Sequence, residues 1–146
     1  MQMPIPIIVA TGVVVLALGL NIVVLLLSPS PLGIAIPMIF ATLLLIGLVR
    51  AHRLAWQWGR YLAPLSGLAF IGGALSNFAF GSFLNILVGA LDLVVAFGMF
   101  CFPILLSRES ASRYFRLICP GCAARSSKAA DFFFNRAKCQ KCQQIW

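Results

Sequence analysis

The sequence predicts an all-α membrane protein, in which a bundle of four transmembrane helices is followed by a small cysteine-rich C-terminal domain. Hydrophobic residues make up 62% of the chain and charged residues only 10%, whereas soluble domains contain about 45–50% and about 25%. A chain of 146 residues could not bury this much apolar surface in water. The apolar residues also form long runs, and short polar or proline-rich breaks separate them.

The first two spans are predicted at residues 7–27 and 32–49. A helix needs about 20 apolar residues to cross a hydrocarbon core of about 30 Å, and neither run contains an ionisable side chain. No basic segment precedes the first run and no small-residue cleavage site follows it, so we expect a retained span rather than a signal peptide. Two prolines between residues 28 and 31 end the first helix, because proline cannot continue it.

The third and fourth spans are predicted at residues 61–80 and 83–106, joined by a Gly-Ser turn. A polar and aromatic connector at residues 50–60 precedes them. Small residues let helices approach closely in lipid. The spacing of Ala69 with Gly73, and of Gly12 with Gly19, therefore favours a packed bundle.

The distribution of charge predicts the orientation of the bundle. Three of the 11 basic residues lie between residues 50 and 60, and the other eight lie between residues 108 and 141. Four spans place these two segments on the same side of the membrane. Because cytoplasmic segments are enriched in Lys and Arg, we expect both termini in the cytoplasm, with the bundle in a bacterial inner or plasma membrane.

Asp92 is the only acidic residue inside a predicted span, and Asn85, Asn77 and Asn21 are placed to form a polar site with it. Intramembrane acids are costly and are functional candidates by default. One interpretation is a proton or cation site, or a docking point for an arginine of another subunit. The alternative is a protonated or amide-bonded carboxyl group that only holds the helices together.

The strongest motif is C-x2-C-x16-C-x2-C, formed by Cys119, Cys122, Cys139 and Cys142. This spacing is typical of a four-cysteine zinc site, in which two tight turns each supply two thiolates to a tetrahedron. Iron is a less favoured metal, since nothing nearby suggests a route for electrons. Disulfides are disfavoured in a reducing cytoplasm, and we expect the fifth cysteine, Cys101, to be a packing residue.

Residues 119–146, about a fifth of the chain, resemble a zinc ribbon, a rubredoxin-like pair of cysteine knuckles. Ala123 and Gln143 stand where such knuckles usually carry glycine. The resemblance implies a structural Zn²⁺ bound by the four cysteines and implies no particular activity.

Two features of the tail suggest contacts outside the metal site. Residues 107–118 have apolar positions at helical spacing and predict a connector helix at the membrane interface. The aromatic residues 132–134, with Ile145 and Trp146, exceed what so small a ribbon can bury, so we expect one face to contact the bundle or a partner protein. The basic residues of the ribbon suit anionic lipid headgroups.

These observations predict a non-enzymatic accessory subunit of a larger membrane complex, in contact with lipids and other membrane subunits. No nucleophilic triad, phosphate-binding loop or pair of carboxylates indicates an enzyme. One alternative is a small oligomeric transporter or channel that uses Asp92 for proton or cation coupling. A second is a membrane-tethered regulator whose ribbon binds nucleic acid, which is less favoured because lipid explains the basic charge equally well.

Overall fold

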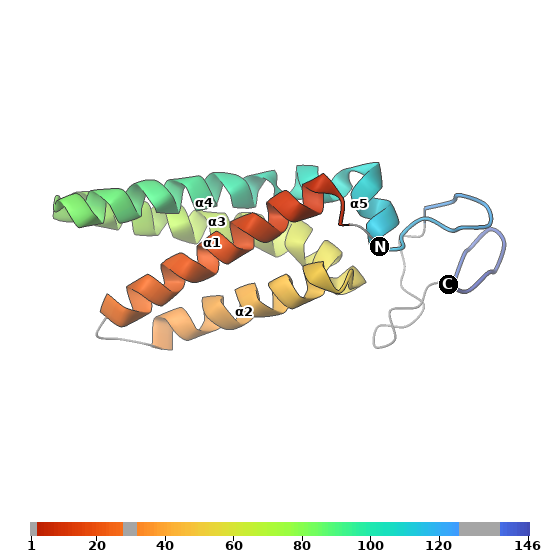
Figure 1. The fold of residues 1–146 in the computed structure, drawn as a ribbon, viewed down its shortest axis with the longest axis horizontal. Coiled ribbons are helices and arrows are strands. Elements are labelled where there is room, and N and C mark those ends of the chain that lie inside the picture. The colour runs from red at the N-terminus through yellow and green to blue at the C-terminus, as the bar shows by residue number, and fades with distance from the viewer. Residues whose placement is uncertain (1–2, 28–31, 126–137) are drawn as a thin grey trace.

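A computed structural model describes residues 3–27, 32–125 and 138–146. Four long helices form an elongated bundle, and a short fifth helix with the cysteine loops lies at one end of it (Figure 1). The described residues contain no strand, only two isolated antiparallel bridges. The helices are α1 (Ile5–Leu27), α2 (Leu32–Val49), α3 (Arg53–Phe80), α4 (Phe83–Ser107) and α5 (Glu109–Tyr114).

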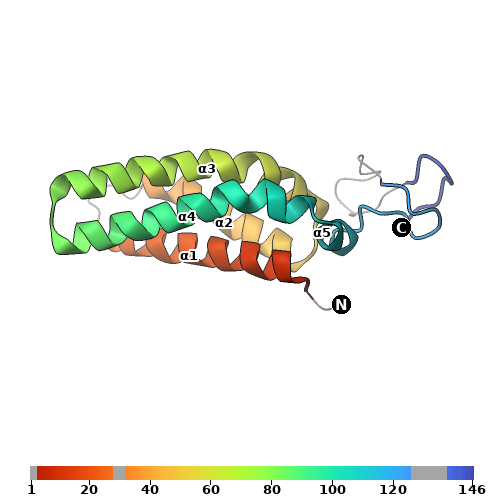
Figure 2. The same ribbon diagram turned by 90° about the horizontal axis from the view of Figure 1, so that it is seen from above.

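The bundle consists of two antiparallel helix pairs. Helices α3 and α4 run side by side along their whole length, and α1 and α2 lie against them as a second pair (Figures 1 and 2). The start of α1, the α2–α3 connection, α5 and the cysteine loops all lie at one end of the bundle. The α3–α4 turn lies at the other end. This arrangement brings the described basic residues of both segments to the same end, as the sequence predicts.

Three helices of the described chain, α1, α3 and α4, are long and apolar enough to cross a membrane, which fits an integral membrane protein. Helix α2, the second predicted span, has only 18 residues, or roughly 27 Å at about 1.5 Å per residue. Large apolar side chains also cover the outside of the bundle, among them Phe83, Leu26 and Ile5 at 81%, 80% and 77% exposure. Water tolerates such continuous apolar surface poorly.

Helix α3 begins eight residues before the predicted third span, since Arg53 and not Tyr61 is its first residue. The chain leaves α2 through Ala51, whose backbone is left-handed at φ 52°. His52 then caps α3, because its side chain accepts a hydrogen bond from the Leu54 amide. Most of the predicted 50–60 connector is therefore helical, and the reversal from α2 to α3 takes only three residues.

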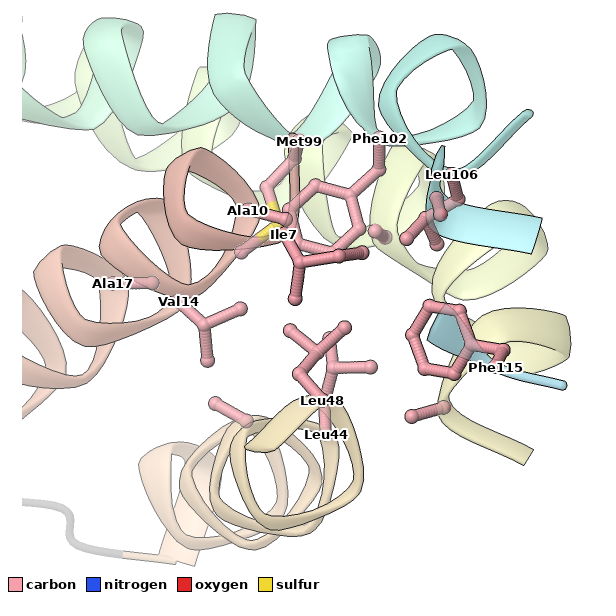
Figure 3. Packing of buried hydrophobic residues seen from close by; sticks show 14 of the residues in the cluster. Ile7, Ala10, Val14, Ala17, Leu44, Leu48, Met99, Phe102, Leu106 and Phe115 are labelled. Atoms are coloured by element: carbon pink, nitrogen blue, oxygen red, sulfur yellow. The ribbon is translucent and has the colours of Figure 1, made fainter. Parts of the chain in front are cut away.

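The best-packed part of the core lies near the end of the bundle that carries α5. Ile7 and Val14 from α1, Leu48 from α2 and Phe102 from α4 are fully buried there, and Phe115 joins them from beyond α5 (Figure 3). The cysteine loops therefore adjoin the most completely buried region of the molecule.

The close contact between α3 and α4 involves Gly73, which the sequence singled out, and also Gly67. A Cβ atom on Gly73 would lie 3.3 Å from Asp92 Oδ2 of α4. A Cβ atom on Gly67 would lie 3.2 Å from the Ala96 carbonyl oxygen of α4, so this glycine lets α3 and α4 approach closely. Around Gly12 and Gly19 there is nothing within 4 Å of such an atom. The packed bundle that the sequence predicts therefore does not depend on these two glycines, which lie exposed on α1.

Candidate metal centre

The first cysteine loop follows α5 and closes with two short backbone hydrogen bonds. The Cys119 amide donates to the Ala124 carbonyl, and the Ala123 amide donates back to the Cys119 carbonyl, both at 2.9 Å. An antiparallel bridge between Ile118 and Arg125 joins the two ends of the loop. The loop therefore holds its second cysteine beside the first without any regular strand.

The second loop repeats the same pattern near the C-terminus. The Cys139 amide donates to the Gln144 carbonyl at 2.8 Å, and the Gln143 amide donates to the Cys139 carbonyl at 3.0 Å. A bridge between Lys138 and Ile145 closes it. Two equivalent turns thus face each other, which is the arrangement that a knuckle pair needs.

The positions where knuckles usually carry glycine adopt the backbone conformation that glycine favours. Ala123 has φ 54° and Gln143 has φ 59°. For a residue with a Cβ atom this left-handed conformation costs roughly 1–2 kcal/mol. The turn geometry is therefore formed despite the missing glycines, and the rest of the loop must offset the cost.

The four sulfur atoms all lie within 4.8 Å of one another. Cys119 Sγ is 3.5 Å from Cys142 Sγ, and Cys122 Sγ is 3.3 Å from Cys139 Sγ. A tetrahedral zinc ion with bonds of about 2.3 Å separates its sulfur ligands by about 3.8 Å, whereas a disulfide needs about 2.05 Å. The predicted ligands therefore come together as free thiols in a cluster that could bind a metal ion such as zinc.

The pKa values of the thiols show how the sulfurs share protons. The Cys142 amide donates to Cys139 Sγ and is the main reason that the pKa of Cys139 is lowered to about 6. At Cys142 a hydrogen bond from the Gln144 amide lowers the pKa of the thiol. Hydrogen bonds with the sulfurs of Cys119 and Cys139 have the larger combined effect and raise this pKa to about 12. A metal ion would replace these shared protons, because metal ligation requires thiolates.

One side of the cluster is open to the surface. Cys119 and Cys139, the first cysteine of each loop, are buried, while Cys122 and Cys142 are exposed. Exposed basic side chains at Arg125 and Lys138 lie in the loops themselves. The aromatic residues 132–134 and the other basic positions between the loops lie outside the described residues.

A buried arginine joins the cysteine loops to the bundle. Arg53, at the start of α3, is only 6% exposed. Its Nη2 donates to the Arg116 carbonyl at 2.6 Å, and its Nε donates to the Phe115 carbonyl at 3.4 Å. Trp146 Nε1 donates to the same Arg116 carbonyl at 2.9 Å, and the Arg53 guanidinium carbon lies 5.6 Å from the centroid of the Trp146 ring.

This contact partly fulfils the expectation that the aromatic side of the tail packs on the bundle, since Trp146 does so. In the sequence, Arg53 is only one of three basic residues between residues 50 and 60, so this contact was not predicted. The nearby Trp56 and Trp58 were the one distinguishing feature of the sequence context of Arg53, and tryptophans are common at membrane interfaces in general.

Helix α5 attaches the loops to the bundle at a second point. The Tyr114 hydroxyl lies 3.0 Å from the carbonyl oxygens of both Leu48 and Val49, where α2 ends, and shares its one hydrogen between them. Burial raises the pKa of Tyr114. The helix spans six residues rather than the predicted 107–118, because the chain turns at Arg116, which has φ 54°. Its inner face packs on the core.

The predicted polar site inside the bundle forms in part. Asn77 Nδ2 donates to Asp92 Oδ2 at 3.0 Å, and Asp92 is 5% exposed. These two residues and Asn21 line one cavity, but Asn85 is not among the residues that line it. Asn85 lies instead in the first turn of α4, where its backbone amide donates to the Ser82 side chain.

Comparisons of the chain with protein-family models, curated proteins and solved structures gave no match. The function must therefore be argued from the geometry of the chain itself.

Proposed function

We propose that this chain is a non-enzymatic accessory subunit of a larger membrane complex, and that its zinc-loaded cysteine domain docks a partner at the cytoplasmic face. The observation that carries the proposal is the attachment of the cysteine loops to the bundle through Arg53, Trp146 and the Arg116 carbonyl. A module attached in this way holds a fixed position relative to the bundle. A fixed position suits docking better than a flexible tether would.

The cysteine cluster supports a structural zinc ion. Four thiolates suit a soft metal such as zinc and leave no open coordination position for a substrate. Structural zinc contributes roughly 10–16 kcal/mol of apparent folding energy in small fingers. The described loops have two isolated bridges and no strand, so they depend on such a contribution to keep their shape.

The surface of the bundle supports a membrane location with the cysteine domain in the cytoplasm. Apolar side chains cover the lateral faces, and the basic segments lie at the end of the bundle that carries the loops. Lys and Arg are enriched on the cytoplasmic side of membrane proteins. Basic residues at this end are also placed to contact anionic headgroups.

The outer side of the loops is the surface that we assign to the partner. Cys122 and Cys142 are exposed, Ile145 is 61% exposed, and the loops project beyond the bundle (Figure 1). An apolar side chain beside exposed basic residues is typical of a protein-binding surface with a polar rim.

The test is gentle extraction of the full chain from its native membrane, followed by native mass spectrometry and metal analysis. Wild type should carry one zinc ion per chain together with a co-purifying membrane protein. Cys119→Ser should lose the zinc and the partner. Arg53→Lys should keep the zinc and lose most of the partner, because lysine cannot bridge two carbonyls and stack on Trp146 as a planar guanidinium does.

Two matched variants serve as controls. Cys101→Ser removes a cysteine outside the cluster, and Arg50→Lys changes an exposed arginine three residues from Arg53. Both should retain zinc and partner. Recovery of wild type as a lone chain, or equal partner recovery from Cys119→Ser, would contradict the proposed function.

A further inference from the structure

A cavity of about 620 Å³ lies between the two helix pairs, away from the cysteine loops. Side chains from α1, α2 and α3 form most of its wall, and Asp92 lines it from α4. Most of the lining is apolar. Its volume falls in the range of about 300–1,000 Å³ that is typical of small-molecule sites.

One oxygen of the Asp92 carboxyl group accepts a hydrogen bond from another side chain of the protein. Asn77 Nδ2 donates to Oδ2, and a Cβ atom on Gly73 would lie 3.3 Å from the same oxygen, so the absence of a side chain there makes room for the carboxylate. The other oxygen, Oδ1, accepts no hydrogen bond from any residue that the structure describes. Asp92 therefore has an acceptor to offer to a ligand.

Two further polar side chains that line the cavity, Ser66 and Asn21, donate to backbone carbonyls of their own helices. The Ser66 hydroxyl donates to the Leu62 carbonyl at 3.0 Å, and Asn21 Nδ2 donates to the Ala17 carbonyl at 2.8 Å. No Lys or Arg lines the cavity, so the protein itself supplies no cation to the Asp92 carboxylate.

We propose that this cavity binds an apolar molecule that carries a single protonated amine, whose ammonium group donates to Asp92. Buried charges in proteins are paired or hydrogen-bonded, because an isolated charge in an apolar environment is very costly. Asp92 lies nine residues after Phe83, the first residue of α4, which is roughly 14 Å along the helix at about 1.5 Å per residue. A ligand that reaches this depth must be mainly hydrocarbon.

The test compares three probes with the same tail and different head groups. The full chain is purified in an uncharged detergent and titrated with dodecylamine, dodecanol or dodecanoate, and native mass spectrometry measures the amount bound. Wild type should bind dodecylamine about tenfold or more tightly than dodecanol, since hydrogen bonds to charged groups contribute about 1.5–3 kcal/mol. In Asp92→Asn this preference should disappear.

A second pair of variants leaves Asp92 unchanged, so that the test does not depend on whether Asp92→Asn folds normally. Ala69 lines the cavity and is exposed, and Ala79 is exposed on the same helix but does not line it. Ala69→Phe should reduce dodecylamine binding, while Ala79→Phe should not. Equal binding of all three probes by wild type, or an unchanged amine preference in Asp92→Asn, would overturn the proposal.

Competition with phosphatidylethanolamine distinguishes two sources of the ammonium group. Displacement of dodecylamine by this lipid supports the site and shows that a lipid headgroup can fill it. Failure to displace it excludes the lipid headgroup and leaves a free apolar amine as the proposed ligand.

Discussion

At the scale of single residues, backbone conformation at four non-glycine positions shapes the region around the metal centre. Ala51, Arg116, Ala123 and Gln143 all have left-handed backbones, with φ between 52° and 59°. Each lies where the chain reverses, after α2, after α5 and inside each cysteine loop. The turn at Arg116 accompanies the most important polar contact, because its carbonyl accepts hydrogen bonds from both Arg53 and Trp146.

The Tyr114 hydroxyl gives a residue-scale prediction. Tyr114→Phe should lower the free energy of unfolding by about 1 kcal/mol at neutral pH, because the carbonyls at the end of α2 lose their buried donor. Chemical denaturation in detergent micelles, followed by circular dichroism, measures this loss. Tyr61→Phe is the matched control, since the Tyr61 side chain is 65% exposed and its replacement should change little.

The same variant should also alter the dependence of stability on pH. Burial raises the pKa of Tyr114 in the fold, so the neutral phenol contributes stability below the unfolded pKa of about 10. That contribution is lost as the pH rises above this value, because the unfolded phenol ionises first. The difference between wild type and Tyr114→Phe should therefore shrink above about pH 10. A constant difference would contradict the role given to the hydroxyl.

At the scale of helices, the α3–α4 pair is the most extensive contact in the bundle. Small residues of α3 face α4 along this contact, and Gly59, Ala63, Gly67 and Ala74 are all buried. Helices in lipid gain little from apolar burial and depend on close van der Waals packing instead. We therefore expect the α3–α4 pair to hold the bundle together, with α1 and α2 packed against it.

A comparison of two glycines tests this role of the α3–α4 contact. Gly67→Leu should destabilise the protein by roughly 1–3 kcal/mol, because the new side chain overlaps α4 at Ala96 and Met99. Gly12→Leu adds the same group where nothing lies within 4 Å and should be neutral. Thermal unfolding of the two variants, followed by helical circular dichroism, decides the matter. Equal melting temperatures would show that the contact is looser than described.

At the scale of the whole molecule, the two ends of the bundle differ in chemical character. One end carries the N-terminal part of α1, the α2–α3 connection, α5 and the cysteine loops. The other end carries the uncharged α3–α4 turn. This asymmetry is the structural basis for the proposed orientation.

Thiol labelling of intact cells tests the orientation. In a Cys101→Ser background, a cysteine replaces Phe83 beside the α3–α4 turn or Ser110 in α5, both of which are exposed. A membrane-impermeant maleimide should label Phe83→Cys in intact cells and Ser110→Cys only after lysis, because the proposed orientation places the basic end in the cytoplasm. The Cys101→Ser protein without an added cysteine is the control, because any label that it takes up is bound to the four clustered cysteines. Labelling of Ser110→Cys from outside would reverse the proposed orientation.

Local patterns in the sequence predicted most of the helices and the ligand set. The second span was predicted at the bounds that α2 has, 32–49, and the fourth differs from α4 by one residue. Both follow from run length and from breaks at Pro, Gly and Ser, which act over a few residues. The cysteine spacing likewise identified all four sulfurs that cluster, since each pair is supplied by one local turn.

The sequence by itself determined the apolar helices, the charge asymmetry and the four sulfur ligands. The tertiary structure decided which glycines allow close packing, where α3 begins, and that Asn77 and Asn21 share a cavity with Asp92 while Asn85 does not. It also selected Arg53 as the link to the cysteine loops, through hydrogen bonds to residues 62 and 63 positions later in the chain. Such contacts depend on how whole helices pack, and no local pattern in the sequence records that packing.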